Sequence, residues 1–333
     1  MSEENLNFDE AAKRDLERRE YQSAETENES EKSVVSFDEK ETKPTSLGKA
    51  RDYQGDRDDE PALLPGYHEI WAENFPSKGL YYTEGTRFFI RAASVKEIRH
   101  FSTINEQDPF SVDEALNEII KGCLMMRVPG RQASFKDLRE EDRIHVIMTI
   151  RDLTFVNGEN KLAIKATCNE CNHDNEIVIN NQSFETNEIP ETLSKYYDEE
   201  RKMFVIQTKS CGTIELVPPS IGVMGEVTKY IRRAQEQEGK KLDTSFVKNL
   251  PYMVTDWRGF NDQKIKNLEI EFMQWNSTKY QTFNALTEMC KIGVKEQLVK
   301  ECEKCGSEVR TQITFPGGIK SLFVVSDIAG ELL

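Results

Sequence analysis

Two pairs of cysteines are the residues of this sequence best suited to chemistry. Cys168 and Cys171 form the pair CNEC, and Cys302 and Cys305 repeat its spacing in CEKC much later in the chain. A Cys-x-x-Cys turn presents two sulfur atoms on one small loop, and a structural zinc ion is bound by four such ligands in a tetrahedron. The sequence therefore predicts one structural zinc site. The alternative is that one or both pairs are reduced surface thiols without a metal.

The predicted zinc site is closed, because four cysteines fill every coordination position and leave none for water or substrate. Such a site is structural, and here it would join one half of the chain to the other. His173 follows the first pair and could replace a cysteine, but its position favours a solvent-facing side chain. Cys123 and Cys290 fall at apolar helical positions and are expected in the core. Cys211 precedes a glycine turn and is expected nearer the surface.

No other residues form a recognisable catalytic or ligand-binding pattern. The histidines are scattered, and the sequence has no glycine-rich phosphate loop and no nucleophile elbow. Residues 140–142 are consecutive acids near the start of a predicted helix, and we interpret them as a solvated helix terminus that favours the helix dipole. Aromatic and Met side chains in residues 273–283 are interpreted as core or partner-facing surface. An enzyme that uses an unrecognised arrangement of residues stays an alternative, but the sequence offers no residues to assign to it.

The elements that must position the cysteines occur in the same order in two parts of the chain. Residues 84–98 predict a glycine turn, a short apolar strand and a helix capped by Ser94. Residues 211–224 repeat that outline. Helices then follow in each part, which argues for an internal duplication. The predicted helices cover residues 111–126 and 135–155 in the first part, and 220–237, 244–255 and 262–291 in the second.

Each cysteine pair is expected between two strands. Residues 161–167 alternate between apolar and polar side chains and lead into the first pair, and residues 176–180 continue after it. Residues 291–301 and 309–315 flank the second pair in the same way. This layout is typical of a zinc ribbon, with Gly306 at the turn of the second pair.

The predicted fold class is α+β, with two similar units joined by a zinc-ribbon-like four-cysteine site. The first unit covers residues 64–182 and the second covers residues 183–333, and each ends in a Cys-x-x-Cys knuckle. Residues 1–63 precede them as a disordered acidic arm, because acidic side chains far outnumber basic ones there and apolar clusters are scarce. The low mean hydropathy of −0.64 agrees with such an arm.

The composition indicates where in the cell the protein is found and which partners it can bind. The chain of 333 residues has seven cysteines, an odd count, and its beginning does not resemble an export signal, so thiols or a metal are expected and not a disulfide framework. No segment is apolar enough for a membrane span, which predicts a cytosolic protein without a membrane partner. The formal net charge of −15 disfavours nonspecific nucleic-acid binding.

Several of these segments together resemble the baseplate hub and hub-assembly proteins of T-even-like contractile-tailed phages. The resemblance rests on FPSKGLYYTEGTRFFIRAASVKEI at residues 75–98, on GTIELVPPS, on both cysteine pairs and on TFPGGIKSLFVVSDI at residues 314–328. It covers about residues 64–333, and the order of the segments carries it. The acidic arm departs from the shorter members of the family.

The resemblance implies a structural or chaperone-like assembly protein of the central hub of the tail baseplate, without enzymatic activity. Such a protein is made in the cytoplasm of the infected bacterium and either enters the virion baseplate or leaves before the particle is complete. Its partners would be other baseplate hub proteins, without a small-molecule substrate. The alternative is a zinc-ribbon module that binds nucleic acid, and the acidic charge balance argues against it.

Overall fold

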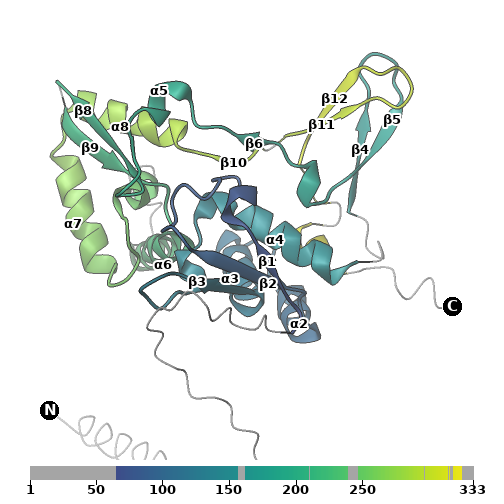
Figure 1. The fold of residues 1–333 in the computed structure, drawn as a ribbon, viewed down its shortest axis with the longest axis horizontal. Coiled ribbons are helices and arrows are strands. Elements are labelled where there is room, and N and C mark those ends of the chain that lie inside the picture. The colour runs from purple at the N-terminus through teal and green to yellow at the C-terminus, as the bar shows by residue number, and fades with distance from the viewer. Residues whose placement is uncertain are drawn as a thin grey trace, which may run out of the picture. The chain divides into compact units, whose positions relative to one another are not determined.

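The computed structural model describes residues 65–156, 162–209, 211–238, 247–295, 297–313, 315 and 318–324. All of them belong to one compact unit, Ala62–Leu333. Helices and antiparallel strands are mixed along this unit (Figure 1), which confirms the predicted α+β class. The predicted acidic arm, residues 1–63, lies outside the described residues, so its disorder stays a prediction.

A three-stranded antiparallel sheet with the order β1-β2-β3 begins the fold. Residues alternate across the middle strand, so Phe88 and Ile90 are fully buried, whereas Phe89 lies on the other face beneath two arginine guanidinium groups. The middle strand also contacts helix α4 (Glu140–Thr154). The three strands are β1 (Tyr67–Ile70), β2 (Arg87–Arg91) and β3 (Leu124–Arg127).

Two helices connect the second and third strands. They are α2 (Val95–Ser102) and α3 (Pro109–Cys123). Ser94 caps α2 as predicted, and its backbone N–H donates to the Glu97 carboxylate at 2.8 Å. This capping box fixes where the chain turns from the sheet into the helix.

The helix predicted over residues 111–126 is correct in its middle and wrong at both ends. It begins at Pro109, which suits the first helical position because it has no N–H to satisfy, and Asp108 caps it. At the other end the chain leaves the helix and enters β3 at Leu124. Pairing with β2 provides hydrogen bonds for the backbone N–H and carbonyl groups there, and strand alternation still buries Leu124 and Met126.

A second three-stranded antiparallel sheet, with the order β7-β8-β9, lies in the later part of the unit. Helices follow it along the chain and pack on its apolar residues. The strands are β7 (Tyr197–Asp198), β8 (Met203–Thr208) and β9 (Gly212–Leu216), and the helices are α6 (Ile221–Glu238), η4 (Val247–Met253), α7 (Asp262–Met273) and α8 (Ser277–Met289).

Two of the predicted helices in this part differ from the structure. Of residues 244–255, Val247–Met253 form a 3-10 helix that contains Pro251. The long helix predicted over residues 262–291 is interrupted between α7 and α8, where Asn276 caps the second helix. The break lets the Trp275 ring pack against Phe272, with their centroids 4.7 Å apart. Aromatic packing therefore overrides the helical pattern.

Two β-hairpins frame the cysteine pairs, and they lie next to each other at one side of the unit (Figure 1). Lys300 of the second hairpin donates through Nζ to the Glu176 carbonyl of the first at 2.8 Å. The predicted strands on both sides of each pair are present. Three are shorter than expected, and the strand predicted over residues 176–180 has the expected length but begins two residues earlier. The four strands are β4 (Ala163–Thr167), β5 (Asp174–Val178), β11 (Gln297–Glu301) and β12 (Glu308–Gln312).

Short elements complete the described residues. They are η1 (Ala72–Asn74), η2 (Phe135–Asp137), η3 (Asn181–Ser183), β6 (Thr186–Asn187), α5 (Glu191–Ser194), β10 (Gly293–Val294) and η5 (Ile319–Leu322). The two short strands pair with each other, so the segment leaving the first hairpin runs beside the segment entering the second. This pairing brings the two hairpins together at their base.

Buried apolar side chains form two clusters within the unit. The first contains the β1-β2-β3 sheet residues, α3, α4 and both cysteine hairpins, and it includes Leu298 and Val309 from the second hairpin. Phe323, near the end of the described chain, packs edge-on against Phe101 with ring centroids 5.2 Å apart. The second cluster contains β8, β9, α6, α7 and α8. The later part of the chain therefore returns to complete the first core.

Asp137 links the two clusters through a set of hydrogen bonds. Its carboxylate accepts from Arg131 Nη1 at 2.8 Å, from Trp257 Nε1 at 3.0 Å and from both Nη atoms of Arg258 at 2.9 Å. Burial raises the pKa of Asp137, but hydrogen bonds from the two guanidinium groups outweigh it and lower the pKa below its usual value. The carboxylate thus stays charged and paired across the junction.

Candidate metal centre

The first cysteine pair sits on a tight turn between β4 and β5. The Cys168 backbone N–H donates to the His173 carbonyl at 2.8 Å, and the Asn172 N–H donates back to the Cys168 carbonyl at 3.0 Å. Asn172 adopts a left-handed conformation with φ of 54°, which asparagine tolerates better than most residues. The turn therefore folds around the two cysteines and aims their sulfur atoms to one side.

The second pair forms the same turn between β11 and β12. The Cys302 N–H donates to the Ser307 carbonyl at 2.8 Å, and the Gly306 N–H donates to the Cys302 carbonyl at 2.9 Å. Gly306 has φ of 75° and takes the left-handed position of the turn, as predicted. The two knuckles thus share one hydrogen-bond pattern, although they are far apart in sequence.

The structure brings the four predicted cysteines together. Their sulfur atoms all lie within 4.8 Å of one another, and two short contacts cross between the knuckles. Cys168 Sγ is 3.6 Å from Cys305 Sγ, and Cys171 Sγ is 3.6 Å from Cys302 Sγ. Tetrahedral bonds of about 2.3 Å to zinc place sulfur atoms about 3.8 Å apart, so the spacing fits such an ion. It is far too long for disulfide bonds.

The four ligand residues differ in exposure. Cys168 and Cys302 are buried, Cys171 is half-buried and Cys305 is exposed. Burial raises the pKa of the Cys302 thiol, but the backbone N–H groups of Cys305 and Lys304 outweigh it and bring the pKa to about 6. Backbone N–H groups within the second knuckle therefore favour the Cys302 thiolate, which is the form that binds a metal.

Asn175 is a buried neighbour of the cysteines that the sequence reasoning missed. Its Nδ2 lies 3.6 Å from Cys302 Sγ, and its Oδ1 accepts the backbone N–H of Glu303 at 3.0 Å. Both contacts reach from the first hairpin into the second knuckle. No spacing rule within the sequence points to this residue, because its partners come from a distant segment.

The remaining candidate residues lie apart from the four-cysteine centre. Cys123 and Cys290 are buried, which confirms their predicted place in the core. Cys211 is half-buried, with Sγ 3.9 Å from Thr282 Oγ1. His173 is half-buried and contributes its backbone carbonyl to the knuckle, and it is not among the clustered ligand atoms.

The acids at residues 140–142 do not form a solvated helix terminus, and for Asp142 that interpretation is wrong. Asp142 is fully buried and accepts hydrogen bonds from the Ser77 N–H at 2.9 Å, Ser77 Oγ at 2.7 Å and the Tyr82 hydroxyl at 2.6 Å. Burial raises its pKa, and these three donors oppose that effect. The segment before β2 folds over the start of α4, so the carboxylate fastens that segment to the helix.

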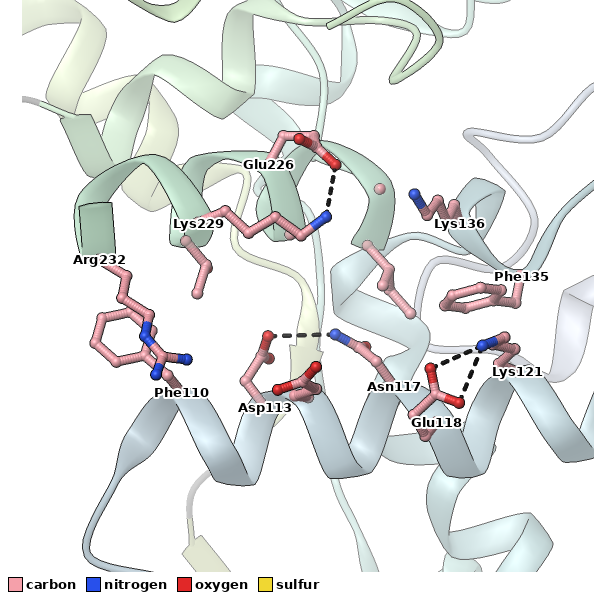
Figure 2. A pocket seen from close by; sticks show the side chains of 15 residues that line it. Phe110, Asp113, Asn117, Glu118, Lys121, Phe135, Lys136, Glu226, Lys229 and Arg232 are labelled. Atoms are coloured by element: carbon pink, nitrogen blue, oxygen red, sulfur yellow. Dashed lines mark hydrogen bonds and ion pairs between the residues drawn. The ribbon is translucent and has the colours of Figure 1, made fainter. Parts of the chain in front are cut away.

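A groove of about 350 Å³ lies between α3 and α6 (Figure 2). Gly225 of α6 leaves open space there, because no atom lies within 4 Å of where its Cβ would be. Charged side chains on its rim pair within their own helices: Glu118 with Lys121 at 2.9 Å, and Glu226 with Lys229 at 3.0 Å. The described residues that line it include neither Cys nor His.

Comparisons with known proteins add nothing to the geometry: no protein-family model matches the chain, and no curated protein or solved structure matches it. Among helices of the described ranges, none is long and apolar enough to cross a bilayer. The four-cysteine centre is therefore the feature from which function must be argued.

Proposed function

We propose that this protein is a structural or assembly protein of the central hub of a phage tail baseplate. It acts through protein–protein contacts with other hub proteins and has no enzymatic activity. The observation that carries the proposal is the four-cysteine centre, whose ligands all come from the protein and leave no position for a substrate. The resemblance of residues 64–333 to hub and hub-assembly proteins supplies the biological setting, which is the infected bacterial cytoplasm and the virion baseplate.

The metal of this centre is zinc in a structural role. Four thiolates at tetrahedral spacing suit zinc or iron. Zinc fits a structural role better than iron, because it has no redox chemistry that could alter the site. Cys168 and Cys171 would hold the ion from the first hairpin, and Cys302 and Cys305 from the second. The ion then supplies a cross-link between segments that are distant in the chain.

The two knuckle-bearing parts of the chain arose by duplication. Support comes from the matching hydrogen bonds of the knuckles and from the two glycines that precede β2 and begin β9: Gly85 has φ of 79° and Gly212 has φ of 72°. In each part the strand after that glycine is the later strand of an antiparallel pair and a serine precedes the next helix. The parts have diverged, because no strand of the described residues lies beside β9 as β3 lies beside β2.

A nucleic-acid-binding ribbon is the competing function, and the surface of the hairpins disfavours it. Exposed acids surround the knuckles on both hairpins, and a four-thiolate zinc centre adds further negative charge. These acids are Glu170, Asp174, Glu176, Glu301, Glu303 and Glu308. Tight retention of DNA on a filter at moderate salt would favour the ribbon module over the hub protein.

Quantitative mass spectrometry of gradient-purified phage particles and of the crude infected lysate tests the hub proposal. A fixed small copy number in particles, together with baseplate proteins, identifies a hub subunit. Abundance in the lysate with absence from particles identifies an assembly factor, provided the protein co-purifies there with hub intermediates. Absence from both particles and hub intermediates contradicts the proposal.

A further inference from the structure

Asn175 makes the two knuckles unequal. It is 1% exposed on β5, and the corresponding position after the second cysteine pair is occupied by Val309, which is 2% exposed. A buried valine needs no partner, whereas a buried amide must find hydrogen bonds for its oxygen and its nitrogen. The first hairpin therefore contains a polar group whose partners explain its burial.

The partners fix how the amide is oriented. Oδ1 accepts the Glu303 backbone N–H at 3.0 Å, and Nδ2 donates to the His173 carbonyl at 3.0 Å and lies 3.4 Å from the Ala166 carbonyl. The opposite orientation would place the oxygen against two carbonyl groups and leave the Glu303 N–H facing a donor. The nitrogen thus points toward Cys302 Sγ, 3.6 Å away.

We propose that Asn175 is a positioning residue for the metal centre: it holds the second knuckle in place before the ion binds and donates a hydrogen bond to the Cys302 thiolate afterwards. This inference rests on the proposed four-cysteine metal site. Hydrogen bonds to a ligand atom orient it and tune its donor strength, and their loss typically lowers metal affinity by about 10–100-fold. Val309 has no polar side-chain group and cannot make such a contact with the first knuckle. The first hairpin therefore positions the second knuckle, and not the reverse.

The test compares Asn175→Val, which copies the residue of the other knuckle, with the wild type and with Thr167→Val. Thr167 donates to Asp174 at 2.7 Å on the exposed face of the same hairpin, so its replacement controls for general weakening of the hairpin. Zinc affinity is measured by competition with a chelator, and Co²⁺ absorption reports tetrahedral thiolate coordination. Asn175→Val should lower zinc affinity about 10–100-fold and shift the Co²⁺–thiolate charge-transfer band to lower energy, while Thr167→Val changes neither.

A second measurement keeps the inference testable if Asn175→Val folds poorly. In metal-free wild-type protein, hydrogen exchange of the Glu303 N–H should be slow, because this N–H donates to Asn175 Oδ1 whether or not the ion is bound. Zinc affinity of Asn175→Val within twofold of the wild type, or fast exchange of that N–H in the folded metal-free protein, overturns the role of Asn175. A wild-type protein that binds neither zinc nor Co²⁺ overturns the metal site itself, which is a distinct outcome.

Discussion

Replacement of Tyr82 with Phe removes one hydroxyl group from the buried Asp142 carboxylate and tests whether that carboxylate fastens residues 75–82 to α4. The Tyr82 hydroxyl donates to Asp142 Oδ2 at 2.6 Å and also accepts the Arg139 backbone N–H at 3.0 Å. A hydrogen bond to a charged group contributes about 1.5–3 kcal/mol, and the N–H left without its partner costs about 1 kcal/mol more. We therefore expect Tyr82→Phe to lower the free energy of unfolding by about 2.5–4 kcal/mol.

Urea unfolding at neutral pH, followed by circular dichroism, measures this loss. The control is Tyr196→Phe, because the Tyr196 side chain is 38% exposed and its change should stay within about 0.5 kcal/mol. The slope of the free energy against urea should be unchanged in both variants, since neither changes the surface exposed on unfolding. A loss below about 1 kcal/mol in Tyr82→Phe would show that the Asp142 contacts do not fasten the segment.

The pH dependence gives a second check on the same contact. Burial raises the pKa of Asp142 above 3.8, so the folded state holds this proton more tightly than the unfolded state. Its contribution to stability is therefore fully present below the unfolded pKa and is lost as pH rises through the folded pKa. Removing the Tyr82 donor raises the folded pKa further. The deficit of Tyr82→Phe should consequently shrink at acidic pH, where the carboxyl is neutral in both proteins.

Three further predictions concern the metal centre and the start of α4. Serine at both Cys302 and Cys305 should abolish the one bound zinc per chain measured by elemental analysis, and full retention of zinc would contradict the four-cysteine site. After chelation, iodoacetamide should modify the exposed Cys305 before the buried Cys168 in peptide mass spectra, and the reverse order would contradict the observed burial. Burial raises the pKa of Glu141 well above 4.5, and Glu141 Oε2 has no hydrogen-bond partner among the described residues. The contribution of Glu141 to stability therefore falls as pH rises through its folded pKa. Glu141→Gln should therefore unfold less readily at pH 8, by about 1–2 kcal/mol, and an unchanged pH profile in thermal unfolding would refute this.

The spacing of the cysteines was enough to predict the four cysteines that the structure brings together, because a Cys-x-x-Cys turn is a local unit. The knuckle conformation follows from one residue in each turn, Gly306 or Asn172, that accepts a left-handed backbone. Asn175 could not be found in this way. Its role depends on the approach of a hairpin from a distant part of the chain, and nothing local to residues 174–178 specifies that approach.

The wrong interpretations have the same cause. The acidic run at residues 140–142 fits a solvated helix terminus as long as nothing covers it, and the structure places Ser77 and Tyr82 over Asp142. Leu124 continues a helical pattern in sequence, yet pairing with β2 draws it into a strand. In both cases tertiary contacts decide between local alternatives of similar energy. Most predicted elements are present, but strands β3 and β8 were not predicted, and the ends and burial of the others depended on packing.

The position of the metal centre indicates how far its loss would propagate. The ion would close a long loop of chain between the knuckles, and closing such a loop stabilises a fold by several kcal/mol in the entropic account. That loop is already closed by other contacts, because Phe323 packs on Phe101, and Leu298 and Val309 belong to the first core. The β6–β10 pairing closes it again at the base of the hairpins. Metal removal should therefore release the outer ends of the two hairpins while both cores persist, so the proposed metal would stabilise the two hairpins and would not be the source of the fold.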